Sequence, residues 1–368
     1  MLSCVCWPFG LAGGSVAERR DVISARRASE WFSRQPLACA SCYLRRQKSF
    51  DRPSIFNRSQ ECHVLCVLCA SVVNSFTTEA QRARRRPESV KRLCLAYLKL
   101  MMRKVSEMNF GLKHQVILVS GGAKGIGEGV VRVLAAEGAI PVIIGRNESD
   151  NAAVVQSIET NGGQAFAVHA ELSQDDECRR AVEATVRKFG RIDGLVNNAG
   201  VNDGVNLEHG DSERFVASLR KNLLHYYELA HFALPELKKT RGAIVNIGSK
   251  VAETGQGGTS AYAAANGGRN ALTREWAVEL AKYGIRVNAV IVAECWTPMY
   301  ASWLSTVPNP EETRRQIESR IPLGQRMTTC EEIANTVAFL LSPRSNHTTG
   351  QLIHVDGGYV HLDRAIQR

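Results

Sequence analysis

The stretch from Val116 to Gly127, VILVSGGAKGIG, decides the fold of this chain. Its first four residues are apolar and mostly β-branched, which indicates a buried strand, and apolar residues recur behind it at helical spacing. A glycine-rich turn therefore joins a strand directly to a helix, which a merely structural turn would not require. Free N–H groups at such a helix N-terminus, and glycines that let the backbone approach closely, suit a pyrophosphate. The sequence predicts a dinucleotide-binding loop made by Gly121, Lys124, Gly125, Ile126 and Gly127.

Six further short apolar runs follow, separated from one another by helical or polar stretches. They are expected to be strands at 142–144, 165–168, 195–196, 244–247, 287–291 and 352–355. Strands that alternate with helices imply a parallel sheet covered on both faces. The sequence therefore predicts one α/β domain of the Rossmann type, with a doubly wound sheet of seven parallel strands. Helices should stop at Gly138 and near Gly284, and the segment 303–320, broken by Pro308 and Pro310, is expected to be a flexible substrate lid.

Charge and cysteine content divide the chain at Met108. Residues 1–107 carry 19 Lys and Arg against 8 Asp and Glu, whereas residues 108–368 carry 27 against 28. Eight of the eleven cysteines also precede Met108. Because residues 1–107 show no helical or strand periodicity, we expect a basic, Cys-rich, non-globular extension before a folded domain at 108–368. The abrupt change favours a start assigned upstream of the true one.

Other interpretations of residues 1–107 stay open. The pairs Cys39-x-x-Cys42 and Cys66-x-x-Cys69 have zinc-ligand spacing, and Cys62 with the second pair has the spacing of an iron–sulfur loop. The arginines at 82, 84, 85 and 86 can contact phosphates, and a segment rich in Arg and Ser also fits a targeting presequence. A Cys- and Arg-rich stretch yields such spacings by chance, so neither a metal site nor a nucleic-acid partner is predicted.

The remaining composition points to a protein without a membrane partner. No apolar run approaches the roughly 18 residues that a membrane span needs. Cys178, Cys295 and Cys330 lie far apart in the sequence, so we expect buried thiols in a reducing compartment and not a disulfide framework. A cytoplasmic location is expected on this basis.

Further motifs accompany the glycine-rich turn. Asn197-Asn-Ala-Gly follows a strand, Ser249 precedes Tyr262 by thirteen residues, Asn222 lies in a helix, and Asp356-Gly-Gly follows the last strand. In this combination, spread over the whole folded domain, the chain resembles the short-chain dehydrogenase/reductase superfamily. The resemblance implies the strand order 3-2-1-4-5-6-7, a nicotinamide dinucleotide cofactor and hydride transfer at a CH–OH group. It also implies a homotetramer formed through the helices that hold Asn222 and Tyr262.

The same resemblance assigns the cofactor residues. Relatives that use NAD end their second strand with an acidic residue for the ribose diol, whereas here Gly145 is followed by Arg146. Unless both cations only solvate the surface, Arg146 and Lys124 can pair with a 2′-phosphate, so NADP is preferred and NAD is the alternative. The other expected cofactor contacts are Glu171, Leu172, Asn198, Ala199, Gly200, Tyr262, Asn266 and Thr297.

The catalytic residues depart from the family pattern at one position. In the family a Tyr exchanges a proton with the substrate oxygen, and a Ser hydrogen-bonds that oxygen. A Lys four residues after the Tyr stabilises the phenolate and binds the nicotinamide ribose. Tyr262 and Ser249 match, and Asn222 matches the residue that supports a water chain to the Lys, but the Lys position is Asn266.

Asn266 carries no charge, and this predicts a weak enzyme. A free tyrosine titrates near pH 10, so about a thousandth of it is phenolate at pH 7; a further loss of two pH units of acidity costs about 2.7 kcal/mol. Lys250, beside Ser249, is a poor replacement because adjacent strand residues point to opposite faces. We therefore expect slow or absent turnover with cofactor binding retained. A non-catalytic dinucleotide-binding protein is the alternative.

Several segments resemble sugar dehydrogenases of the L-fucose dehydrogenase group, namely 190–203, 254–257, 272–276 and 356–364. This implies oxidation of an aldose at C1 to a lactone. After the sixth strand, Val292-Ala-Glu stands where most relatives have Pro-Gly, and a carboxylate there suits sugar hydroxyls. Lys250, Gln256, Glu294 and Trp296 are the expected substrate contacts, with Trp296 stacking on the sugar. The alternatives are a solvated loop for Glu294 and core packing for Trp296.

Overall fold

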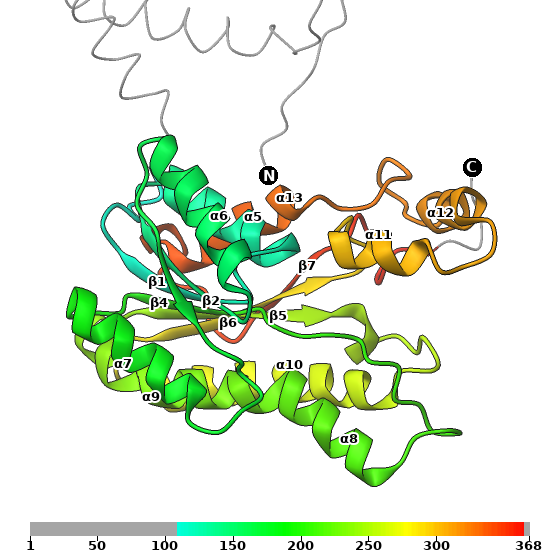
Figure 1. The fold of residues 1–368 in the computed structure, drawn as a ribbon, viewed down its shortest axis with the longest axis horizontal. Helices are drawn as coiled ribbons and strands as arrows, with labels where there is room; N and C mark the ends of the chain where they lie inside the picture. Colours follow the sequence, from blue (N-terminus) through cyan, green and yellow to red (C-terminus); the bar gives the residue numbers. More distant parts are fainter. Residues whose placement is uncertain (1–108, 364–368) are drawn as a thin grey trace, which may run out of the picture. The chain divides into compact units, whose positions relative to one another are not determined.

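The computed structural model describes residues 109–363, and the predicted extension with its Cys and Arg motifs lies outside them. Seven parallel strands form one sheet in the order β3-β2-β1-β4-β5-β6-β7 (Figure 1). Both the Rossmann-type α/β class and the predicted strand order are thereby confirmed. The strands are β1 Val116–Ser120, β2 Ile140–Gly145, β3 Phe166–His169, β4 Gly194–Asn197, β5 Ala243–Ser249, β6 Arg286–Val292 and β7 Leu352–Val355.

Helices cover both faces of this sheet, as Figure 1 shows. One face carries α5 Gly125–Ala136, α6 Glu148–Thr160 and α13 Cys330–Leu341. The other carries α7 Glu177–Phe189, α9 His225–Thr240 and α10 Ser260–Ala281. The remaining elements are α8 Ser212–Leu219, η1 Arg220–Leu224, η2 Lys250–Ala252, α11 Pro298–Leu304, α12 Pro310–Ser319 and η3 Pro343–Ser345.

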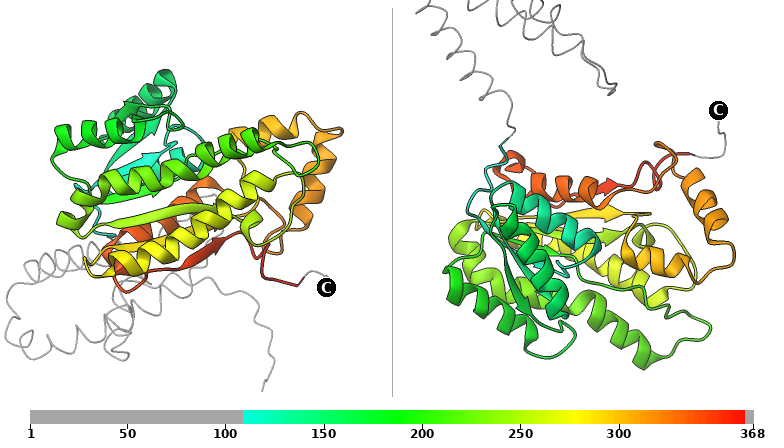
Figure 2. Two further views of the ribbon diagram at one scale, coloured as in Figure 1. Left: turned by 90° about the horizontal axis from the view of Figure 1, so that it is seen from below. Right: turned by 45° about the horizontal axis from the view of Figure 1, so that its top comes forward.

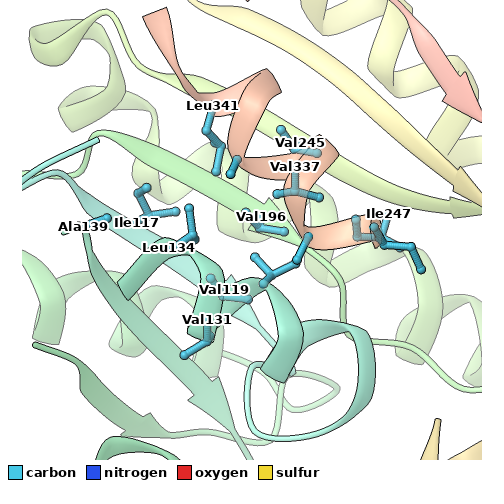
Figure 3. Packing of buried hydrophobic residues seen from close by; sticks show 14 of the residues in the cluster. Ile117, Val119, Val131, Leu134, Ala139, Val196, Val245, Ile247, Val337 and Leu341 are labelled. Carbon is cyan, nitrogen blue, oxygen red and sulfur yellow. The ribbon is translucent and has the colours of Figure 1, made fainter. Parts of the chain in front are cut away.

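Two apolar cores result from the alternation of side chains along each strand. Ile117 and Val119 of β1 are fully buried on the side of α5 and α13, where Figure 3 shows Ile117 beside Leu134 and Val119 beside Val131. Leu118 is fully buried on the opposite side, in the core formed with α7, α9 and α10. Because both faces of β1 are packed, the turn that follows it has a fixed position at the carboxyl end of the strand.

The segment 303–320 contains the end of α11 and all of α12, two short helices that lie together at one end of the sheet (Figure 2). Residues 305–309, which include Pro308, separate the two helices, and Pro310 is the first residue of α12, so the break predicted at these prolines is confirmed. Proline is compatible with the first helical turn because an N–H there has no intrahelical partner. Gly138 and Gly284 follow α5 and α10 with left-handed φ angles of +78° and +73°, as expected for residues that end helices.

The thiols of the described residues are free, as predicted. Cys178 and Cys295 are buried, but Cys330, which begins α13, is only half-buried, contrary to the expectation. Its Sγ lies 3.9 Å from that of Cys295. Among the helices of residues 109–363, none combines the length and apolar character that crossing a bilayer requires.

Candidate active site

The glycine-rich turn after β1 has the geometry of a phosphate cradle. Gly121 and Gly125 have φ angles of +65° and +57°, which favour glycine. A methyl group at Gly127 would lie 2.1 Å from the Gly121 carbonyl oxygen, so α5 approaches the turn as closely as only glycine allows. Lys124, the N-cap of α5, makes no side-chain capping hydrogen bond. The first-turn N–H groups of α5 are therefore available to an anion.

The loop after β4 fastens this turn from the other side. The Ser120 hydroxyl accepts hydrogen bonds from the N–H groups of Asn198 and Ala199 at 2.8 and 3.0 Å. In return, Asn198 Nδ2 donates to the Ser120 carbonyl at 2.9 Å. Sequence reasoning named both motifs but missed Ser120, whose signal was a buried hydroxyl at the end of an apolar strand. The two motifs form one unit.

Both predicted phosphate-binding cations lie near the carboxyl end of β2. Lys124 Nζ lies 2.6 Å from Asp150 Oδ2 in the first turn of α6. The Arg146 side chain is 80% exposed, and its Nη1 lies 3.5 Å from Glu171 Oε2. Burial raises the pKa of Glu171, but hydrogen bonds from Ser173 and the charge of Arg146 outweigh it and lower the pKa overall. Each cation thus already has a carboxylate beside it.

Three other predicted cofactor residues have identifiable positions. Thr297 caps α11 by accepting the Tyr300 N–H at 3.1 Å. Its side chain faces the glycine-rich turn, because a methyl group at Gly125 would lie 3.4 Å from the Thr297 Cβ. Leu172 is 8% exposed and packs in the core with α7, so only its backbone is available to a ligand. Ile126 is half-buried in the first turn of α5.

The catalytic candidates come from three elements. Ser249 is the last residue of β5, and Tyr262 lies in the first turn of α10; both are half-buried. Asn222 is fully buried in η1, a π-helical turn between α8 and α9, and its Oδ1 accepts the Val201 N–H at 2.8 Å. π-Helical turns are rare in proteins as a whole, but those that occur are often found at functional sites. Asn222 therefore joins η1 to the loop that fastens the glycine-rich turn.

A buried arginine, Arg269, contacts the residue at the position where the family has lysine. The fully buried Asn266 donates from Nδ2 to the Tyr262 carbonyl at 2.8 Å, and its Oδ1 accepts from Arg269 Nη1 at 3.1 Å. Arg269 is 3% exposed and also donates to the carbonyls of Asn222 and Ile247, at 2.8 and 3.2 Å. A guanidinium only donates, which fixes the orientation of the Asn266 amide.

The charge of Arg269 acts on neighbouring aromatic rings in this part of the interior. Within residues 109–363 no carboxylate forms an ion pair with it. Its Cζ lies 4.3 Å from the ring centroid of Tyr226 and 6.0 Å from that of Tyr262. Burial, and secondly Arg269, lower the pKa of His225 to about 3. Burial raises the pKa of Tyr226, and Arg269 opposes that rise.

The loop after β4 also makes room for this arginine. A methyl group at Gly200 would lie 2.8 Å from Arg269 Nη2 and 3.0 Å from Asn222 Oδ1. Sequence reasoning missed Arg269, although residues 262, 266 and 269 follow the i, i+4, i+7 pattern of one helix face. A cation therefore lies three residues after the position where the family's lysine is missing.

Two of the four predicted substrate residues come together. Lys250 Nζ forms a largely buried ion pair with Glu294 Oε1, and Glu294 Oε2 accepts the Tyr300 hydroxyl at 2.9 Å. Lys250 Nζ also lies 4.1 Å from the ring centroid of Tyr359. Burial, then the Glu294 charge, raise the pKa of Tyr300. Tyr300 and Tyr359 are additions that sequence reasoning missed, since no motif contains Tyr300.

The other two predicted substrate residues lie differently. Gln256 is exposed between η2 and α10 and makes no hydrogen bond with Lys250 or Glu294. Trp296 is 39% exposed, and the Arg314 guanidinium of α12 lies 4.3 Å from the centroid of its ring. One face of the indole is therefore already occupied by a cation.

Comparison with known proteins identifies the family. The model of a family described as enoyl-(acyl carrier protein) reductase matches residues 121–360, which include both fastened loops and the catalytic candidates. The chain belongs to the short-chain dehydrogenase/reductase superfamily. It is an oxidoreductase of that superfamily, whose members act on alcohol and ketone groups with nicotinamide cofactors.

Members of this superfamily with different substrates are similar to the chain. The L-fucose dehydrogenase of Bos taurus is 35% identical over 66% of this chain and 88% of its own length. The 3-oxoacyl-(acyl-carrier-protein) reductase FabG of Thermotoga maritima is 38% identical over 68% of this chain and 99% of its own length. Among solved structures, the Cj0485 dehydrogenase is 43% identical with a TM-score of 0.68, and the match covers 71% of this chain and 100% of that one.

A sugar enzyme is also among the solved structures. The aldohexose dehydrogenase of Thermoplasma acidophilum is 25% identical with a TM-score of 0.62, over 70% of this chain and 98% of its own.

Proposed function

We propose that the chain oxidises an aldose similar to L-fucose at C1, giving a lactone, with a nicotinamide dinucleotide as hydride acceptor. The observation that carries the substrate class is the polar cluster of Lys250, Glu294 and Tyr300, which begins one residue after Ser249. A buried ion pair suits a ligand with several hydroxyl groups, which can hydrogen-bond to both charges, whereas an acyl chain adds no polar partner. The similarity to L-fucose dehydrogenase supports the same class.

The residues present fit the cofactor. The cradle at Gly127, which a methyl group would fill, and the uncapped first turn of α5 suit the pyrophosphate, while Thr297 lies beside the same turn. When bound, the nicotinamide accepts the hydride from C1. Tyr262, as phenolate, accepts the proton of the anomeric hydroxyl, and Ser249 holds that oxygen by a hydrogen bond. The protein thus supplies alignment and proton transfer.

Arg269 argues for turnover despite Asn266. Its guanidinium carbon lies 6.0 Å from the centroid of the Tyr262 ring, so a positive charge is present near the tyrosine although the family's lysine is absent. Arg269 is therefore proposed to take over part of the electrostatic role of that lysine, as a positioning residue that touches neither substrate nor cofactor. The opposite proposal, slow or absent turnover because of Asn266, stays a prediction that the same assays test.

The test is an aldose panel with NAD and NADP on the purified full chain, with cofactor fluorescence measured in parallel. We expect cofactor binding together with oxidation of at least one aldose that shares the stereochemistry of L-fucose at several carbons. Cofactor binding with no oxidation of any aldose, alcohol or ketone would favour the alternative of a non-catalytic dinucleotide-binding protein.

NADP is the proposed preference, because Arg146 and Lys124 surround the end of β2. Arg146→Gln is expected to weaken NADP binding about 10-fold, since one charge-assisted hydrogen bond is worth about 1.5 kcal/mol at such an exposed site, and to leave NAD binding unchanged. Calorimetric titration with both nucleotides measures this. Arg132→Gln, on the outer surface of α5, is the matched control. Equal effects on both nucleotides would contradict the assignment.

Glu294 is proposed to bind sugar hydroxyls. Glu294→Gln is expected to raise the KM for the aldose about 10-fold, because a hydrogen bond to a charged group is worth about 1.5–3 kcal/mol, and to change the cofactor Kd little. Steady-state kinetics on folded variants, verified by thermal denaturation, check this. Glu208→Gln at an exposed carboxylate is the control. An unchanged KM in folded Glu294→Gln would remove Glu294 from the substrate site.

A homotetramer is proposed as the assembly. Tyr227 in α9 and Val278 in α10 are 50% and 79% exposed, although both are large and apolar. Helix α9 follows the turn that holds Asn222, and helix α10 contains Tyr262. The family resemblance assigns the subunit contacts to these helices. A cytoplasmic location is proposed with it.

A further inference from the structure

A cluster of metal-ligating side chains lies outside the candidate active site. Glu253, His354 and His361 each offer one ligand atom, and these three atoms lie within 4.8 Å of one another. His354 Nε2 is 3.1 Å from Glu253 Oε2, and the two imidazole rings meet nearly at right angles with centroids 4.3 Å apart. His354 is half-buried and Glu253 and His361 are exposed residues, so the cluster lies at the surface and is open to an ion.

Three separate segments bring these ligands together. Glu253 follows η2, directly behind the β5 strand end that carries Ser249. His354 lies in β7, which forms an edge of the sheet, and pairs with Ile291 of β6. His361 comes from the tail after β7. Glu253 and His354 lie about a hundred residues apart in the sequence. No spacing motif therefore indicates the cluster, and a metal site was not predicted.

The turn after β7 is built to return the tail to the sheet. Asp356 is 6% exposed; its Oδ1 accepts the Gly358 N–H at 2.8 Å and its Oδ2 accepts the Val360 N–H at 2.9 Å. Gly357 and Gly358 adopt φ angles of +63° and +83°, which reverse the chain. The Asp-Gly-Gly motif therefore places His361 beside His354, seven residues earlier in the chain.

We propose that Glu253, His354 and His361 bind a divalent transition-metal ion, with Zn²⁺ as the best match. Two imidazoles and one carboxylate are a ligand set that zinc accepts, with a fourth position left for water. Tetrahedral bonds of about 2.1 Å place ligand atoms about 3.4 Å apart, so modest side-chain rotations close the cluster around an ion. An ion there would neutralise the carboxylate and satisfy both imidazoles at once.

The ion would have a structural role. It would connect the tail to the segment behind Ser249, and the same tail carries Tyr359, whose ring lies 4.1 Å from Lys250 Nζ. Binding would thus hold Tyr359 over the Lys250–Glu294 ion pair. The site itself does not depend on the proposed sugar activity, because its ligands belong neither to the cofactor loop nor to the catalytic candidates.

The experiment uses the full chain, purified without a polyhistidine tag, freed of metal with a chelator and titrated with Zn²⁺ and, separately, with Co²⁺. We compare the wild type with His361→Ala and Glu253→Gln, and use His347→Ala, at an exposed histidine before β7, as the matched control. Metal content, the visible spectrum of bound Co²⁺ and the thermal midpoint with and without Zn²⁺ are measured. The cobalt spectrum separates this site from any cysteine site in residues 1–107, since only thiolates add charge-transfer absorption.

We expect one equivalent of metal with nitrogen and oxygen ligands in the wild type and in His347→Ala, and a thermal midpoint that rises with Zn²⁺. His361→Ala and Glu253→Gln should each weaken that equivalent about 100-fold or more, since even outer partners of metal ligands are worth 10- to 100-fold. The proposal is overturned if both variants, folded by their thermal transitions, bind the same equivalents with the same cobalt spectrum as the wild type. It is equally overturned if the wild type binds no such equivalent.

Discussion

Arg269→Met is expected to lower kcat for aldose oxidation about 100-fold at neutral pH. The reason is the sign of the charge. A buried cation 6.0 Å from the Tyr262 ring centroid stabilises the negative charge that develops on the tyrosine during proton transfer, so removing it slows the reaction. Cofactor affinity should change little, because Arg269 contacts no part of the glycine-rich turn. The value of kcat with saturating cofactor, measured together with the cofactor Kd, checks this.

A matched variant separates charge from packing. Arg269 also holds the carbonyls of Asn222 and Ile247, so Arg269→Met will destabilise the fold as well. Arg269→Lys loses most of these hydrogen bonds but keeps the charge. It should therefore lose stability in thermal denaturation while it keeps most of the kcat of the wild type. A purely structural arginine would instead make both variants equally slow, which would exclude the proposed electrostatic role.

Position 266 completes the test. Asn266→Lys alone should not raise activity, because it would place an ammonium next to the guanidinium of Arg269. The Arg269 Nη1 lies 3.1 Å from the Asn266 amide oxygen. Two like charges buried together are costly. In Asn266→Lys/Arg269→Met, the cation returns to the family's position, and kcat should recover most of the loss seen in Arg269→Met. Tyr262→Phe sets the floor of the assay. If Asn266→Lys alone accelerates the enzyme, the proposal that Arg269 compensates for Asn266 fails.

Gly127→Ala is expected to weaken binding of both nicotinamide dinucleotides about 10- to 100-fold, since overpacking of a close contact costs about 1–3 kcal/mol. The added methyl group would lie 2.1 Å from the Gly121 carbonyl oxygen, which is part of the backbone and cannot rotate away. The turn must therefore open, and α5 must move from the position in which its first N–H groups point at the ligand. Calorimetric titration of the purified variant measures the loss.

The control for this substitution is Gly267→Ala in α10. A methyl group there meets no atom within 4 Å, and alanine is the better helix former. Gly267→Ala should therefore be at least as stable as the wild type and bind the cofactor normally. Normal cofactor affinity in Gly127→Ala would show that the turn after β1 does not hold the pyrophosphate.

The fold was predictable because its signals are local. Each strand is a short apolar run that ends within one or two residues of its expected bounds, and the glycines of the turn after β1 act within eight residues. Glu294 and Lys250 were also named one at a time from their neighbours in sequence. Their pairing was not, because it arises where the parallel strands β5 and β6 end side by side.

Arg269 could not be predicted in the same way. An arginine on a helix is usually exposed, and its burial here depends on carbonyls that other elements supply, from η1 at Asn222 and from β5 at Ile247. The His354, His361 and Glu253 cluster has the same property, because its ligands meet only after the sheet has formed. Local patterns predict elements, whereas convergent side chains require the tertiary structure.

Gly200 has a consequence for how this site can change during evolution. The absence of a side chain at that residue leaves the volume that the guanidinium of Arg269 fills. A chain with alanine at 200 would have to displace the guanidinium, because the added methyl group would lie 2.8 Å from Arg269 Nη2. Use of an arginine in place of the lysine as the source of charge therefore depends on glycine at position 200, a residue that touches neither the tyrosine nor position 266.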